Sequence, residues 1–78
     1  MELHLTLDRS RRVPLAIQVA HAVRDALAMQ RLQPGARLPA TRELARRLRV
    51  ARLVVVEAYE WLIAEGYAEG RTGSGTYV

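Results

Sequence analysis

Hydrophobic positions recur with a helical period along most of this chain, and the first such segment spans residues 14–29. One face of the segment carries apolar side chains at a spacing of four, with two alanines beside them: Leu15, Val19, Val23 and Leu27, then Ala22 and Ala26. Pro14 suits the first turn of a helix, where its missing N–H is not needed. The pattern predicts a helix from about Pro14 to Met29. Four polar residues fall largely off its apolar face: Gln18, His21, Arg24 and Asp25.

A connector and a second, shorter helix follow. Pro34-Gly35 is a turn dipeptide, and Pro39 disfavours a helix just before it, so the residues between the two prolines have room only for a stub of strand. A helix of about eight residues then starts near Thr41, with Glu43 in its first turn, where an acid suits the helix dipole. Its apolar face consists of Leu44, Ala45 and Leu48.

The stretch "RLVVVEAYEWLIAE", residues 52–65, starts like a buried strand and ends like a helix. No Gly, Pro, Ser, Asp or Asn interrupts it, so nothing marks a break between two elements. One continuous helix places four side chains on a single core-facing side: Val55, Ala58, Tyr59 and Leu62. It also puts Gly66 where a left-handed C-cap belongs, and β-branched residues weaken a helix by only roughly a few tenths of a kcal/mol each. We therefore predict one helix over residues 52–65, with Leu53, Val54 and Val56 off the core face at its start.

Short strands are expected at the two ends of the chain. Residues 3–7, "LHLTL", alternate apolar and polar side chains, which predicts a short strand in an N-terminal arm over residues 1–12. After Gly66, "YAE" and "TYV" flank the glycine-rich "GRTGSG", a pattern typical of a β-hairpin. Two helices joined by a short turn and followed by a hairpin describe a winged helix-turn-helix over residues 13–78. The fold class is therefore α+β, mainly α, with three helices and a small C-terminal hairpin wing.

Composition adds a basic surface to this outline. The 78 residues suffice for one small domain, there is no cysteine, and no apolar run approaches the roughly 20 residues of a membrane span, so a cytoplasmic protein is the default. All twelve basic residues are arginine. Six of them fall in residues 37–52 beside a single acid, Glu43, with which Arg46 or Arg47 is expected to pair, whereas residues 53–70 hold four glutamates and no base. Such a stripe suggests a polyanionic partner, although a solvated helix face gives the same pattern.

Catalytic and metal-binding patterns are lacking. The only serines, Ser10 and Ser74, have no histidine base in a recognisable arrangement, and the glycines beyond residue 65 do not precede a helix as a phosphate-binding loop requires. His4 and His21 have no second ligand at a suitable spacing. We therefore expect no enzyme activity, and neither a metal, a cofactor nor a small-molecule site within this chain.

Two stretches of the chain together resemble a known family. "LQPGARLPATRELARRLRV" followed by "VVEAYEWLIAEGYAEGRTGSGTYV" is similar to the DNA-binding domain of the GntR family of bacterial transcription regulators, and the second stretch looks most like the MocR (PdxR-like) subfamily. The resemblance implies a domain that binds operator DNA as a dimer, with helix 52–65 in the major groove and the 70–75 wing at the minor groove. MocR-like proteins also carry a region similar to type I aminotransferases that binds pyridoxal phosphate. This chain therefore looks like an excised domain, and a natural short protein is the alternative.

The resemblance also implies which residues contact DNA. Arg42 matches the family's arginine at the start of the second helix, and Arg52 matches the arginine that opens the recognition helix. Gly73 matches the wing-tip glycine, which lets backbone N–H groups approach a phosphate. The full candidate set is Thr41, Arg42, Arg49, Arg52, Leu53, Val54, Val56, Arg71, Gly73 and Ser74.

The chain departs from the family pattern within the helix-turn-helix. The family commonly has serine at Ala40, glycine at Arg49, and serine or threonine at Ala51. The two alanines each remove a helix N-cap worth about 1 kcal/mol, and Thr41 is expected to act as the first cap instead. Arg49, if the turn stays left-handed there, costs about 1 kcal/mol of backbone strain.

The start of helix 52–65 and an aromatic residue further along it keep a second function open. Leu53 and Val54 stand where the family commonly has hydrogen-bonding residues, and neither can bond a base edge. The alternative function is therefore a protein-interaction or dimerisation module with weakened DNA readout. Trp61 either packs under the N-terminal strand or contacts a partner chain, and the sequence does not decide between these.

Overall fold

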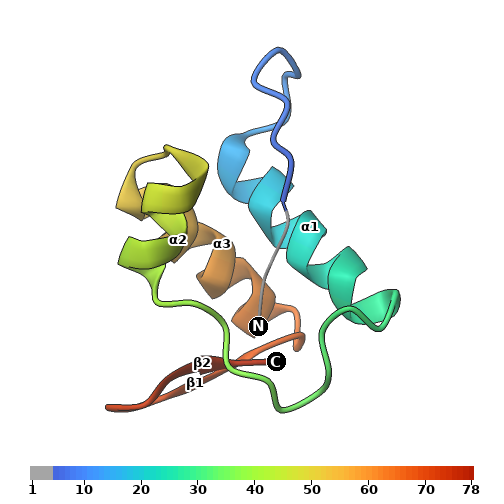
Figure 1. Cartoon of the computed structure of the whole chain (residues 1–78), viewed down its shortest axis with the longest axis vertical. Helices are drawn as coiled ribbons and strands as arrows, with labels where there is room; N and C mark the ends of the chain where they lie inside the picture. Colours follow the sequence, from blue (N-terminus) through green and yellow to red (C-terminus); the bar gives the residue numbers. More distant parts are fainter. Residues whose placement is uncertain (1–4) are drawn as a thin grey trace.

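The computed structural model describes residues 5–78, which form three helices followed by a two-stranded antiparallel hairpin (Figure 1). The elements are α1 (Leu15–Ala28), α2 (Thr41–Leu48), α3 (Arg52–Ala64), β1 (Glu69–Arg71) and β2 (Gly75–Tyr77). This is a winged helix-turn-helix, and the predicted fold class is confirmed. None of the helices in this range is long and apolar enough to cross a membrane.

Helix α3 is one continuous helix, as predicted, and it packs against both α1 and α2. The four side chains expected on its core face are all buried, with exposed fractions of 0–3%. Gly66 has a φ of 83°, as a left-handed residue after a helix should. Leu53 is 62% exposed, as expected, but Val54 is half-buried against the core, so its prediction as off the core face is wrong. Val54 is covered because it packs against the buried core cluster, to which both α2 and α3 contribute side chains.

Gln18 in α1 is buried, although its place in the helical pattern predicts an outward side chain. Its amide oxygen accepts the N–H of Asp8, and its amide nitrogen donates to the carbonyls of Asp8 and Val13, each at 2.9 Å. Gln18 is therefore buried under the chain that precedes α1, and its polar atoms are satisfied by that chain's backbone.

Replacing Gln18 by leucine should lower the free energy of unfolding by about 1–3 kcal/mol, because three backbone hydrogen bonds are lost in a partly buried place. The matched change Gln33→Leu should cost less than about 0.5 kcal/mol, since Gln33 is exposed and donates only to the carbonyl of Gln30. Urea unfolding followed by circular dichroism measures both. Equal losses for the two variants would show that the Gln18 bonds contribute nothing net.

The expected N-terminal strand does not form in the part of it that the structure describes. Leu3 and His4 lie outside the described residues, and Leu5–Leu7 is irregular. Leu5 and Leu7 are half-buried against the core cluster rather than paired with a strand. Alternation alone mispredicted residues 5–7 because Leu5 and Leu7 are covered by packing on the core cluster, without a strand partner. The boundary between residues 12 and 13 stays a prediction.

The connector between α1 and α2 is bonded to the wing. In the hairpin Glu69 pairs with Tyr77 and Arg71 with Gly75, and Tyr77 also forms an isolated bridge with Arg37. The stub of strand expected between the two prolines is therefore confirmed. Further backbone bonds run from Leu38 N–H to Thr76, from Gly35 N–H to Val78 and from Val78 N–H to Ala36, at 2.7–2.9 Å. The wing thus has a fixed place beside the segment that leads into α2.

Candidate nucleic-acid interface

The turn between α2 and α3 depends on one residue in a left-handed conformation. Arg49 has φ 56° and ψ 47°, where the family pattern usually has glycine. The N–H groups of Arg49 and Val50 then bond back to the carbonyls of Arg46 and Ala45, closing α2. Since a side chain in this conformation costs about 1 kcal/mol or more, other contacts must hold the turn.

The N-terminal ends of α2 and α3 are joined by a side-chain contact. The Arg52 Nε–H donates to the Thr41 hydroxyl at 3.1 Å. Ala40 and Ala51 are the N-cap residues of the two helices, and neither helix has a side-chain cap. The prediction that Thr41 acts as a cap is wrong, because Thr41 already lies within α2 and its hydroxyl is engaged by Arg52.

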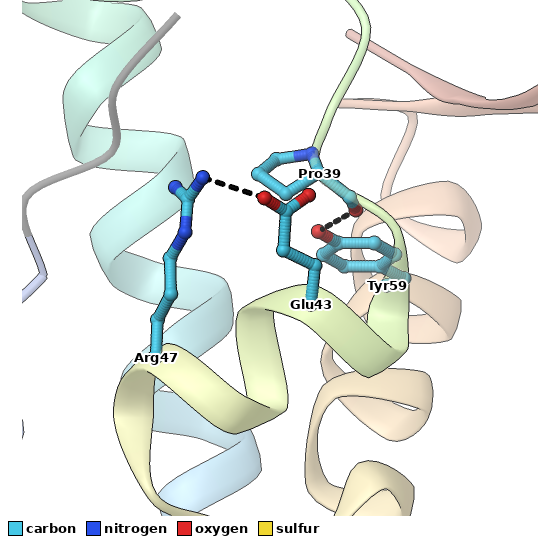
Figure 2. Close-up of polar contacts among 4 residues, drawn as sticks. All are labelled: Pro39, Glu43, Arg47 and Tyr59. Atoms are coloured by element: carbon cyan, nitrogen blue, oxygen red, sulfur yellow. Dashed lines mark hydrogen bonds and ion pairs between the residues drawn. The ribbon is translucent and has the colours of Figure 1, made fainter.

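Exposed positive charge extends along α2, the turn and the start of α3. Glu43, the one acid in the stripe, pairs with Arg47 at 2.7 Å, which confirms one of the two pairings predicted for it (Figure 2). The remaining arginines of α2, the turn and the start of α3 are exposed and make no ion pair with the acids of residues 5–78: Arg42, Arg46, Arg49 and Arg52. We call these four the arginine cluster. Their charge is therefore available to an anionic partner.

Tyr59 fixes α3 to the segment before α2. Its hydroxyl donates to the carbonyl of Pro39 at 2.6 Å, close to the Glu43–Arg47 pair (Figure 2). Burial raises the pKa of the Tyr59 phenol, and the carboxylate of Glu43 raises it further. The phenol therefore stays a hydrogen-bond donor at physiological pH. This bond stabilises the placement of α3 relative to the start of α2, on which the arginine cluster depends.

The wing has an exposed tip and an arginine held along one strand. Gly73 lies at the tip with a φ of 76°, and the N–H of Ser74 closes the turn onto the carbonyl of Arg71 at 3.0 Å. The Arg71 guanidinium pairs with Glu69 at 2.9 Å and lies over the ring of Tyr77, 4.2 Å from its centroid. The positive charge of Arg71 thus lies beside the tip, but it is partly neutralised by the ion pair with Glu69.

Comparison with known proteins identifies this arrangement. Residues 15–78 match the family described as "Bacterial regulatory proteins, gntR family". The chain belongs to the gntR family. It is 43% identical over 74 residues to the probable rhizopine catabolism regulatory protein MocR of Rhizobium meliloti, a match that covers 95% of this chain and 15% of that protein. The MocR-like resemblance seen in the sequence is confirmed, and this chain spans about 15% of the length of that relative.

Solved structures show the same fold. YtrA from Sulfolobus acidocaldarius, a GntR-family transcription factor, superposes with a TM-score of 0.91 at 32% identity, over 95% of this chain and 78% of that one. AraR(DBD) in complex with operator ORX1 superposes with a TM-score of 0.84 at 21% identity, over 100% of this chain and 98% of that one, which shows the fold alone. The chain therefore has the winged-helix DNA-binding fold of the gntR family.

Sequence reasoning missed one residue that contacts the turn of the helix-turn-helix. Arg9, in the arm, donates from Nη2 to the carbonyls of Leu48 at 3.1 Å and Arg49 at 2.8 Å. These residues are 39 and 40 positions apart from Arg9 in the chain, so no local pattern connects them. The guanidinium reaches the helix-turn-helix only because the fold places the arm beside the turn between α2 and α3.

Trp61 packs within the chain. It is half-buried against the core, with the ring of His21 edge-on at 5.4 Å and the ring of Tyr67 stacked at 6.1 Å. Neither alternative left by the sequence is observed within the described residues, because Trp61 packs against His21 of α1 and Tyr67 rather than under an N-terminal strand. Contact with a partner chain stays a prediction.

Proposed function

We propose that this chain binds operator DNA in a sequence-specific manner, with α3 in the major groove and the wing, residues 70–75, at the minor groove. The observation that carries the proposal is the arginine cluster on α2, the turn and the start of α3, which makes no ion pair with the acids of residues 5–78, in a gntR-family fold. Exposed arginines at these places suit phosphate and guanine contacts, because the planar guanidinium donates two parallel hydrogen bonds.

Each part of the surface has a proposed role. Arg42 and Arg52 bind phosphates or guanine from the helix ends, with Thr41 and Arg49 beside them. At the wing the backbone N–H groups near Gly73 approach a phosphate, flanked by Ser74 and Arg71. Apolar contact with thymine methyl groups comes from the start of α3, through Leu53 and Val56, with Val54 limited by its burial. Base discrimination then rests mainly on arginine and on these apolar contacts.

The same proposal includes the oligomeric state of the chain, its place in the cell and its relation to a cofactor domain. The chain acts as a homodimer on its operator, because one winged helix reads only one half-site. It is a regulator rather than an enzyme, and it works in the cytoplasm where the bacterial chromosome lies. Pyridoxal phosphate does not fit these residues, since the cofactor is held through a lysine and this chain has none. A pyridoxal phosphate site is proposed only for a MocR-like protein of which this chain is one domain.

Fluorescence anisotropy on duplex DNA from this gene's own upstream region, across a salt series, tests the proposal. Binding should weaken steeply as salt rises, with a slope of about −0.9 on logarithmic axes for each phosphate neutralised. No binding at low salt, together with self-association that is indifferent to salt, would reject DNA recognition. That result would favour the interaction module suggested by exposed Leu53.

A further inference from the structure

We propose that Arg9 is a positioning residue for DNA recognition: it fixes the turn between α2 and α3 in the conformation that sets the direction of the recognition helix. The proposal deepens the proposed function and rests on it. It concerns a residue of the arm, outside the helices and the wing that are expected to touch DNA.

The carbonyls that Arg9 binds define the turn. Leu48 ends α2, so its carbonyl has no partner within the helix, and Arg49 follows in the left-handed conformation. These two carbonyls belong to the peptide planes on either side of the Arg49 Cα, so their relative direction is set by φ and ψ of Arg49. Holding both on one nitrogen of Arg9 therefore holds those two angles. The cationic donor also suits the negative end of the α2 dipole.

Arg9 is itself held by its neighbours in the arm. The Asp8 carboxylate accepts hydrogen bonds from the N–H and the hydroxyl of Ser10, at 3.0 and 2.5 Å, which closes a tight turn around Arg9. The backbone of Asp8 is bonded in both directions to buried Gln18 of α1. Contacts thus run from the core of α1 through the arm to the turn, and Figure 1 shows this loop at the N-terminal end of α1.

The hydrogen bonds from Arg9 explain how position 49 can be an arginine where the family commonly has glycine. Glycine adopts the left-handed conformation freely, whereas Arg49 adopts it at a cost in backbone strain. The bonds from Arg9 offset that strain. Because only Arg49, Val50 and Ala51 separate the two helices, a change of angle at Arg49 redirects the first turn of α3. Arg9 thus acts on recognition through Arg49.

The test compares Arg9→Ala with Arg11→Ala, which removes the same charge from the same exposed arm and leaves the bonds to the turn intact. In the salt series, Arg9→Ala should weaken DNA binding by about tenfold, the loss of a charge-assisted hydrogen bond, and Arg11→Ala by roughly twofold. Amide hydrogen exchange at Val50, whose N–H bonds to Ala45, should speed up in Arg9→Ala alone.

The variant Arg49→Gly provides a second, independent test. In that background Arg9→Ala should lose much less affinity, because glycine keeps the turn angle without help. If Arg9→Ala lowers overall stability, exchange at Val50 is compared with exchange at buried Leu62 in the same sample, and the faster change at Val50 is still expected. Equal affinity losses in Arg9→Ala and Arg11→Ala, with unchanged relative exchange at Val50, would overturn the proposal. Failure of the wild-type chain to bind DNA would instead reject the proposed function, while the exchange measurement would still decide whether Arg9 holds the turn.

Discussion

Replacing Arg52 by alanine should weaken operator binding by about 10- to 100-fold and lower the steepness of the salt dependence by about one unit. Arg52 opens α3, is exposed, and has its Nε–H on the Thr41 hydroxyl, so its guanidinium is oriented at the junction of two helix ends. Losing it removes a directed contact as well as a charge. Anisotropy titrations of wild type and variant across the same salt series measure both effects.

Arg31→Ala is the matched control for this prediction. Arg31 is also exposed, but it follows α1 and lies outside α2, α3 and the wing. Its removal changes the net charge by the same amount, so any general effect of charge appears in both variants. The same loss of affinity in the two variants would mean that binding depends on overall charge, and the role given to Arg52 would be wrong.

The two leucines of α3 should have opposite phenotypes. Leu62 is fully buried, and its replacement by alanine should lower the free energy of unfolding by about 2–5 kcal/mol through lost contacts and a cavity. A single-core domain of this size has only roughly 3–5 kcal/mol of stability, so Leu62→Ala should remove a large part or all of it at 25 °C. Circular dichroism during urea titration measures this loss.

Leu53→Ala is the same substitution on the same helix, at a side chain that is 62% exposed. It should change the free energy of unfolding by less than about 0.5 kcal/mol, yet lower DNA affinity if this side chain packs into the groove. A large loss of stability in Leu53→Ala would show that Leu53 is covered, as in a dimer of the free protein. That result would support the interaction module.

The helices could be predicted from the local hydrophobic periodicity and from the positions of helix-breaking residues. The valine-rich start of α3 has the composition of a strand, but the absence of any breaker between Arg52 and Glu65, and the glycine that follows, indicate a helix. Tertiary packing on α1 and α2 then outweighs the weak helix propensity of those valines. The resemblance to a family with glycine at Arg49 raised a left-handed turn there only as a condition, and the structure shows that this condition is met.

Contacts between distant parts of the chain could not be predicted in this way. From the helical pattern alone Gln18 is expected to point outward, but in the structure the backbone of the arm covers it. Thr41 has the residue type of an N-cap, but in the structure its hydroxyl is bonded to Arg52. The bond of Arg9 to the turn has no local signal at all. In each case the deciding partner lies ten or more residues away, beyond the reach of helical or strand periodicity.

The bonds between the connector and the wing have a consequence for how the domain assembles. The pairing of Gly35 and Ala36 with Val78 joins opposite halves of the chain, and so does the packing of α1 on α3. Both contacts close long loops, but the hairpin buries few side chains, so it is expected to dock after the three helices have packed together. By the same reasoning it opens at the smallest free-energy cost, since few buried side chains hold it. The exposed tip of the wing, beyond the residues bonded to the connector, is therefore the most compliant part of the proposed interface, able to adjust to the width of the groove after α3 has docked.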